Sequence, residues 1–169
     1  MIRRPIRNLP DRTATKIIRA LQADGRQPWS ALAKLVGLSA PAVAERVRRL
    51  EEAGVIRGYH AEIAPESLGL ALMAFMRVAV PATRYDQVIA KAKRMPEVLE
   101  CHHVLGGDSF LLKIFARDVK HLERIINEFS PLGQTGTTMV LSSPVTKSGL
   151  DPEAAVVRNG ASSPAASAR

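Results

Sequence analysis

The chain of 169 residues is long enough for two small domains or one of ordinary size, and its hydrophobic content of 46% supports a real core. Its formal net charge of +8 at pH 7 favours a polyanionic partner if the excess is concentrated in one region. The single cysteine excludes an intramolecular disulfide framework and favours the cytoplasm, while no apolar run approaches the roughly 18 to 20 residues of a membrane span and no signal peptide is recognisable.

The positive charge is concentrated in the first third of the chain. Residues 1–64 carry 12 lysines and arginines against 6 acidic residues, a balance of +6 that leaves +2 for the remaining 105 residues. Three of these arginines lie in residues 1–10 together with two prolines, which is typical of an arm rather than a packed element. Such a basic N-terminal arm either frays in solvent or contacts phosphate, and the sequence leaves both interpretations open.

Two short helices are predicted after this arm. The first begins at Asp11, a good N-cap, and ends at Asp24. Its apolar side chains recur at helical spacing: Ala14, Ile17, Ile18 and Leu21. Ser30 is expected to cap the second helix, which ends at Gly37. The core face of this second helix is expected to carry three residues: Leu32, Leu35 and Val36.

The stretch from Ser39 to Gly54 is predicted to form a recognition helix. Ser39 can cap its N-terminus, and Gly54 stands where a left-handed C-terminal cap would lie. Val43, Val47 and Leu50 form a narrow apolar stripe that faces a core. Because a tight turn joins this helix to the preceding one, the two are expected to form a helix-turn-helix supported by the first helix.

The opposite face of the predicted recognition helix suits a DNA groove. Four groups on or beside it are expected to bind phosphates and so set affinity and salt dependence: Ser39, Arg46, Arg48 and Arg49. Four others are expected to read bases, by methyl contact with thymine or by a carboxylate that accepts from cytosine: Pro41, Ala42, Ala44 and Glu45. The alternative is an ordinary surface helix in which Glu45 pairs with Arg49 one turn away.

A domain boundary is predicted between residues 65 and 66. Residues 55–63 contain β-branched and aromatic side chains around a central glycine, which predicts a short strand or wing. Pro65 and Gly69 then mark a linker. Residues 11–65 are therefore expected to form a winged helix-turn-helix DNA-binding domain, and residues 66–147 a separate domain.

This second domain is predicted to have a ferredoxin-like βαββαβ fold, so that the whole chain belongs to the α+β class. Strands are expected at residues 70–80, 98–105, 110–116 and 137–142. Two helices lie between them, with the apolar sets Tyr85, Val88, Ile89, Ala92 and Val119, Leu122, Ile126, Phe129. The first strand is apolar on both faces, so a second copy of the chain is expected to cover the face that the helices leave open. Residues 148–169 are rich in Ala, Ser and Pro and are expected to be a disordered tail.

Five segments in this order resemble the Lrp/AsnC family of feast/famine transcription regulators. In the first half they are I-I-R-A-L-Q-A-D-G-R at 17–26, L-A-K-L-V-G-L-S at 32–39 and R-V-R-R-L-E-E-A-G-V-I-R-G-Y at 46–59. In the second half they are V-L-G-G-D-S-F-L-L-K-I at 104–114 and T-T-M-V-L-S-S-P-V at 137–145. The resemblance implies a winged helix-turn-helix joined to an effector-binding regulatory (RAM) domain. It also implies dimers formed through the sheets, further assembly to octamers, and a response to amino acids.

The resemblance places an effector site at the hairpin after residue 105. Many family members read G-D-Y-D-Y there, whereas this chain reads Gly106-Gly107-Asp108-Ser109-Phe110. Glycines let a ligand approach backbone amides, and a carboxylate can receive an α-ammonium group. The expected effector-binding residues come from this hairpin and the last strand: Gly106, Gly107, Asp108, Ser109, Thr135, Gly136, Thr137 and Thr138. The alternative is a plain hairpin turn, which Gly-Asp chemistry also explains.

The sequence offers no constellation for catalysis. Cys101 and His103 would share one face of a strand while His102 faces away, which gives two ligands where zinc needs three or four. We therefore expect no catalytic residue, metal site or cofactor. The predicted function is a sequence-specific regulator that binds double-stranded DNA as a homo-oligomer and responds to an amino acid or related small effector. The alternative is a ligand-independent architectural protein that bends DNA.

Overall fold

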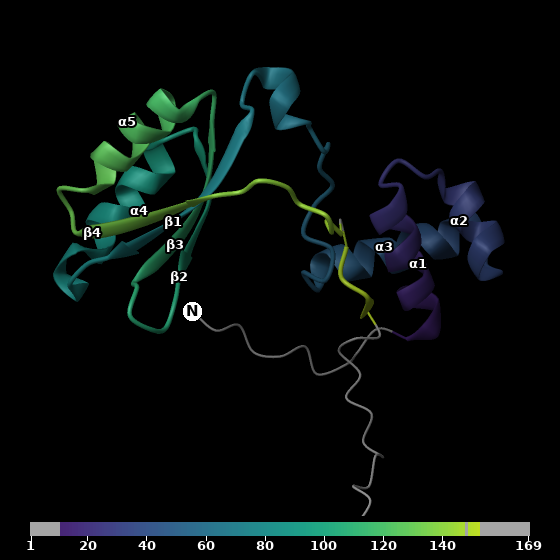
Figure 1. Ribbon diagram of the computed structural model, residues 1–169. Helices are drawn as coiled ribbons and strands as arrows, with labels where there is room; N and C mark the ends of the chain where they lie inside the picture. The colour runs from purple at the N-terminus through teal and green to yellow at the C-terminus, as the bar shows by residue number, and fades with distance from the viewer. Residues whose placement is uncertain (1–10, 148, 153–169) are drawn as a thin grey trace, which may run out of the picture. The chain divides into compact units, whose positions relative to one another are not determined.

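The computed structural model describes residues 11–147 and 149–152 (Figure 1). It divides the chain into two compact units, of which the second comprises Glu62–Pro144 and the first comprises the residues before and after it. The predicted basic arm at residues 1–10 lies outside the described residues, as does most of the predicted tail at 148–169. Within these ranges, no helix has the length and apolar character needed to cross a membrane.

The first unit contains three helices: α1 (Arg12–Ala23), α2 (Trp29–Val36) and α3 (Ala40–Glu52). Their facing side chains form one small core made of Ile17, Leu21, Leu32, Ala33, Val43 and Val47. Two of the predicted caps are confirmed, since Asp11 accepts the Ala14 N–H at 2.7 Å and Ser39 accepts the Ala42 N–H at 3.3 Å. Gly37 ends α2 with φ of 70°, a left-handed conformation that glycine adopts without strain.

Three expectations for this unit are wrong. Helix α2 begins at Trp29 after Pro28, so Ser30 lies inside the first turn and does not cap it. Leu35 is 53% exposed, because the buried face of α2 is centred on Leu32, Ala33 and Val36, about a third of a turn away. Residues 55–63 form no strand, since a strand needs a paired neighbour and the regular elements described in this unit are helices.

The second unit is a four-stranded antiparallel sheet with two α-helices. The strands are β1 (Leu72–Ala79), β2 (Val98–His103), β3 (Phe110–Ala116) and β4 (Gln134–Met139), in the spatial order β2-β3-β1-β4. Helices α4 (Tyr85–Arg94) and α5 (Val119–Phe129) complete a βαββαβ chain order. Two short 3₁₀ turns, η1 (Pro65–Leu68) and η2 (Ala82–Arg84), precede β1 and α4. The predicted ferredoxin-like fold is confirmed.

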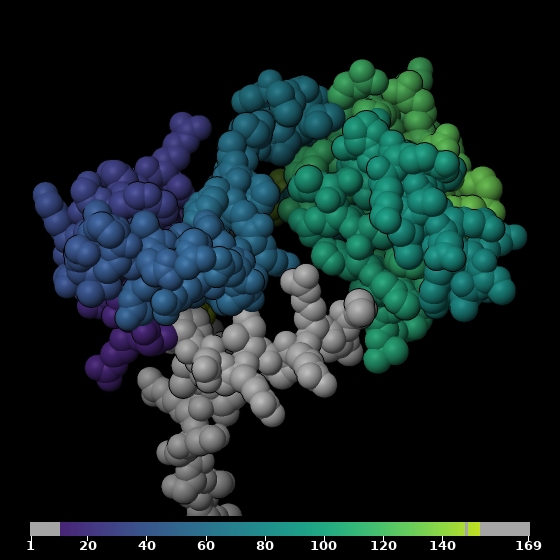
Figure 2. Space-filling view, turned by 180° about the vertical axis from the view of Figure 1, so that it is seen from behind, coloured from purple at the N-terminus to yellow at the C-terminus, as the bar shows by residue number. Residues whose placement is uncertain are grey.

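One face of the sheet packs against the helices and the other is open. The buried side chains of β1 and β3 form a core with α4 and α5: Ala74, Met76, Val78, Phe110, Leu112, Ile114, Ala116, Val88, Ala92, Leu122, Ile125 and Phe129. The intervening residues of the two strands, among them Phe75, Arg77 and Lys113, belong to the other face. Figure 2 views the unit from its helical side, where α4 (teal) and α5 (green) lie together. This open face is the one that a second copy of the chain is predicted to cover.

Three of the four strands have bounds that differ from the prediction: β1 spans residues 72–79 rather than 70–80, and β2 spans 98–103 rather than 98–105. The last strand spans residues 134–139 rather than 137–142, because it pairs with β1 from Ala79↔Gln134 to Ala74↔Met139. Gly133 permits this early start, since a Cβ there would lie 2.2 Å from the Ala79 carbonyl oxygen. Val119 is 67% exposed, because α5 buries the face that carries His121, Leu122, Ile125 and Phe129.

Candidate functional site

The exposed face of α3 is held by a network of ion pairs around Glu45. The Arg48 guanidinium donates to both carboxylate oxygens of Glu45 at 2.8 to 2.9 Å, and Arg49 Nε donates to Oε1 at 2.9 Å. Arg48 also bonds to Glu52 one turn later. These bonds hold the pKa of Glu45 below its usual range, with Arg48 as the larger cause and Arg49 as the second. Glu45 is therefore already occupied as an acceptor, as the surface-helix alternative expected.

The three arginines of α3 consequently differ in how free they are. Arg49 has the most exposed side chain of the three, at 73%, and its bond to Glu45 uses one nitrogen of the guanidinium. Arg48 is bound on both sides by carboxylates. Arg46 lies apart from both and donates from Nη1 to Asp11 Oδ2 at 2.8 Å. Of the predicted phosphate contacts, Arg49 is thus the most available, and Arg46 holds α3 to the start of α1.

The remaining predicted DNA-contacting residues are small and lie near the N-terminus of α3. Ser39 and Pro41 are exposed, whereas Ala42 and Ala44 are half-buried. The Ser39 hydroxyl is used as the helix cap. A helix N-terminus carries partial positive charge and free N–H groups, so the Ser39 end of α3 can approach a phosphate. This end of α3 therefore offers the short side chains of Pro41 and Ala42 and a helix N-terminus, and Arg49 adds an exposed cation farther along the helix.

The predicted effector residues fall into groups that the sheet separates. Register places Gly136 opposite Arg77 and Thr138 opposite Phe75, on the open face. Thr135 and Thr137 alternate to the helical face, where the Thr137 hydroxyl oxygen is buried and has no hydrogen-bond partner among the described residues. The predicted residues therefore do not line one continuous surface.

Arg77 was not among the predicted effector-binding residues, but its side chain lies near both the hairpin and β4. Its Nη1 lies 3.7 Å from Asp108 Oδ2. A Cβ at Gly136 would lie 3.0 Å from Arg77 Nη2, so the glycine leaves room for the guanidinium. The pair offers a cation and an anion side by side, with side-chain exposures of 58% and 37%. Its signal in the sequence was the lone charge within an otherwise apolar strand.

The other hairpin residues have mixed roles. Ser109 is buried, and its hydroxyl donates to the Val80 carbonyl at 2.9 Å and accepts the Val80 N–H at 3.2 Å. Both bonds fix the hairpin to the end of β1, so this hydroxyl is engaged in the fold. Gly106 and Gly107 are exposed, and Gly106 has φ of 144°, a conformation that favours glycine.

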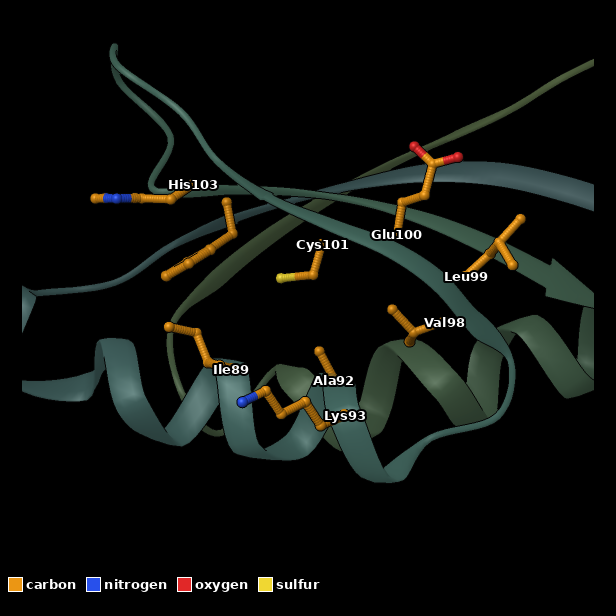
Figure 3. A pocket seen from close by; sticks show the side chains of 9 residues that line it. Ile89, Ala92, Lys93, Val98, Leu99, Glu100, Cys101 and His103 are labelled. Atoms are coloured by element: carbon orange, nitrogen blue, oxygen red, sulfur yellow. The ribbon is translucent and has the colours of Figure 1, made fainter. Parts of the chain in front are cut away.

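A pocket of about 350 Å³ lies elsewhere, between α4 and the edge strand β2. Figure 3 shows Val98 and Cys101 pointing towards Ile89 and Ala92 of α4, while Glu100 points away. Cys101 is an exposed residue, but partial desolvation by the pocket walls raises the pKa of its thiol, which favours the protonated form and weakens it as a metal ligand. Across residues 11–147 and 149–152, no three His, Cys, Asp or Glu side chains are arranged to hold a metal ion.

Comparison with known protein families gives two matches that follow the two units. Residues 11–51 match the AsnC-type helix-turn-helix domain, and residues 73–150 match the Lrp/AsnC ligand binding domain. The first match covers the three helices, and the second begins within β1 and extends beyond β4.

Individual proteins give the same result. The HTH-type transcriptional regulator AldR of Mycolicibacterium smegmatis is 36% identical over 74% of this chain and 77% of its own length. LrpC of Bacillus subtilis is 32% identical over 82% of this chain and 96% of its own length. Its solved structure gives a TM-score of 0.77 and covers 81% of this chain and 98% of the other. The structure of a transcriptional regulator of Neisseria meningitidis, solved in complex with L-Met, gives a TM-score of 0.78 at 29% sequence identity. It covers 83% of this chain and 95% of the other.

Proposed function

Because this chain belongs to the Lrp/AsnC family of transcriptional regulators, we propose that it binds specific DNA sites as a homo-oligomer and responds to an amino acid. The chain is a regulator with a ligand-binding domain, and its relatives are not enzymes. The observation that carries the DNA-binding part is the cationic outer face of a capped α3 within a helix-turn-helix.

In this proposal, α3 enters the major groove with its N-terminal residues towards the bases. Arg49 and the Ser39 end of the helix contact phosphates, which gives affinity without sequence preference. Pro41 and Ala42 present small apolar groups that suit the thymine methyl. Arg46 is also proposed to bind phosphate, and in the free protein its guanidinium donates to Asp11.

The proposed effector site is built on Arg77 and Asp108. An α-amino acid carries a carboxylate and an ammonium group on one carbon, and the guanidinium and carboxylate here are 3.7 Å apart. A bidentate bond from Arg77 would hold the ligand carboxylate, while Asp108 would accept from the ammonium. The similar regulator of Neisseria meningitidis was solved in complex with L-Met, which supports an amino acid as the class of effector.

We propose that two chains pair through their open sheet faces and that such dimers assemble further into octamers. Phe75 is 36% exposed on this face, next to Met73 and Phe115 on the same side of the sheet. Covering apolar side chains of this kind with another protein surface removes them from water and lowers the free energy. A dimer would present two copies of α3 to half-sites about one helical turn apart, roughly 34 to 36 Å, or a multiple of it.

A second candidate function is an architectural protein that bends DNA without an effector. It is favoured by the short side chains at the tip of α3 and by the engagement of Glu45 with Arg48, which leave few groups to read bases. Affinity for a selected binding site and for random DNA, measured at the same salt concentration, separates the two. A ratio near one would support the architectural role and contradict sequence-specific regulation.

The effector is tested by calorimetry of the full chain with each amino acid, with light scattering to follow assembly. We expect at least one amino acid to bind and to change the oligomer mass, because a ligand shifts an assembly through different affinity for its states. Asp108→Asn should weaken this binding at least tenfold. No binding by any amino acid at millimolar concentration would contradict the effector proposal. A cytoplasmic location stays a prediction.

A further inference from the structure

A pocket lined by charged side chains lies at the end of the four-stranded sheet opposite the β2–β3 hairpin. Strand β3 runs from Phe110, next to the hairpin, to Ala116, and Arg117 follows at the far end. There a pocket of about 310 Å³ is lined by Met95, Glu97, Arg117, His121, Arg124 and Glu128. Ile125 supplies part of its apolar floor. This pocket shares no residue with the hairpin site.

Most of the charged side chains of this pocket come from α5 and from the residue that precedes its cap. Arg117 immediately precedes the Asp118 cap of α5, and His121, Arg124 and Glu128 follow it at successive helical turns. Arg117 and Arg124 are exposed, and neither side chain has an ion-pair partner among residues 11–147 and 149–152. Two unpaired guanidinium groups thus lie on one side of a concave surface.

The carboxylates of the pocket are each held by one neighbour. The imidazole Nδ1 of His121 accepts the Arg117 backbone N–H at 3.3 Å, so Nε2 carries the proton and donates to Glu97 Oε1 at 3.1 Å. His121 therefore orients the Glu97 carboxylate. Lys91 donates to Glu128 Oε2 at 2.7 Å and to the Glu128 carbonyl oxygen at 2.6 Å. The charge of Glu128 is thus paired with that of Lys91, whereas Oε2 of Glu97 takes part in no hydrogen bond among the described residues.

We infer that this pocket binds a free α-amino acid, with its carboxylate on Arg117 and Arg124 and its ammonium group on Glu97. The two arginines supply planar donor groups that match a carboxylate. Glu97 supplies the acceptor for a cation, and Met95 and Ile125 supply apolar surface for a side chain. The inference goes beyond the proposed effector site, because it assigns a separate site within one protomer.

The charge balance of the pocket selects this class of ligand. An anion without an ammonium group would meet the two arginines but also the charge of Glu97. A simple cation would be repelled by the two unpaired arginines. A zwitterion uses both sets of charges, so removing either of its charged ends should weaken binding.

Methyl NMR of the full chain labelled at its methionine methyl groups tests this site directly. Met95 lines the pocket, while Met76 is fully buried in the sheet core opposite Thr137 and reports on the fold. Titration with each of the twenty amino acids to about 10 mM would saturate even a millimolar complex. We expect a saturable shift of the Met95 signal with at least one of them, and a tenfold or greater loss of affinity in Arg117→Gln/Arg124→Gln.

Matched variants separate this pocket from the hairpin. Arg94→Gln/Lys120→Gln removes the same charge from residues outside the pocket lining and should leave the Met95 shift unchanged, as should Asp108→Asn. The α-carboxamide and the deamino acid of the bound amino acid should each bind at least tenfold more weakly. No Met95 shift with any amino acid would overturn the inference, as would equal binding of the deamino acid. A shift abolished by Asp108→Asn but kept in Arg117→Gln/Arg124→Gln would overturn it while leaving the hairpin effector site standing.

Discussion

The Arg46 guanidinium donates to Asp11 at 2.8 Å, and the other carboxylate oxygen of Asp11 caps α1 through the Ala14 N–H at 2.7 Å. One aspartate therefore closes the first helix and holds the recognition helix to it. The side chains of the ion pair are 40% and 58% exposed, so solvent screens it and its contribution is at most about 1 kcal/mol. The position of α3 thus depends partly on a residue 35 positions away in the sequence.

Replacing Asp11 by Ala should destabilise the helix-turn-helix unit by about 1 to 2 kcal/mol, because the cap and the ion pair are lost together. Chemical denaturation followed by the fluorescence of Trp29, the one tryptophan of the chain, measures this. Glu62→Ala removes a carboxylate outside the three helices and should have little effect. Equal stability of the Asp11 variant and the parent chain would contradict the structural role of this carboxylate.

Acid should weaken the same unit. The Ala14 N–H and then Arg46 hold the pKa of Asp11 below its ordinary value of 3.8. A carboxyl group with a lowered folded-state pKa stabilises the fold above its unfolded pKa, and this stabilisation is lost as the pH falls through the folded pKa. Stability should therefore decline below about pH 4, and less so in Asp11→Asn. Carboxyl-carbon NMR that places the Asp11 midpoint at or above 3.8 would contradict this.

Glu45→Gln should tighten binding to random DNA. The carboxylate of Glu45 holds Arg48 and Arg49 in the free protein, and its removal frees both guanidinium groups for phosphate. Fluorescence anisotropy at low salt should show a higher affinity for any sequence and a steeper salt dependence. Glu51→Gln, on the same helix but bonded to Tyr59, provides the matched control. Weaker binding by Glu45→Gln would indicate that this carboxylate contacts a base.

Phe75→Glu should disrupt pairing of the chains. It places a charge in the centre of the open sheet face, where covering by a second copy would have to remove the carboxylate from water at a cost in free energy. Light scattering should show a smaller assembly, whereas Val119→Glu, at an exposed position on α5, should leave the mass unchanged. An unchanged mass for Phe75→Glu would place the oligomer interface elsewhere.

The sequence predicted those elements in which local signals agree with tertiary packing. Strand β3 matches its expected bounds, because alternation from Phe110 to Ala116 and the buried face of the sheet require the same residues. The last strand does not, because its start depends on the close approach of Gly133 to Ala79, a contact between distant segments. The wing at residues 55–63 had strand-forming residues but found no strand to pair with.

The candidate sites were predictable to different degrees. The recognition helix could be predicted from its cap, its apolar stripe and its turn, all of which are local. The role of Arg46 could not, because its partner Asp11 is brought near by the packing of α1 against α3. Arg77 was visible as an isolated charge, but its proximity to Asp108 depends on where the folded hairpin places that carboxylate, which the sequence does not show.

DNA binding by Arg49→Ala tests the proposed role of α3 most directly. Fluorescence anisotropy over a range of salt concentrations should show weaker binding to specific and random DNA alike, with the slope of log affinity against log salt reduced by about one. The double variant Arg94→Ala/Lys120→Ala on the regulatory unit should bind as the parent chain does. Unchanged affinity of Arg49→Ala at low salt would remove α3 from the DNA interface and contradict its role as the recognition helix.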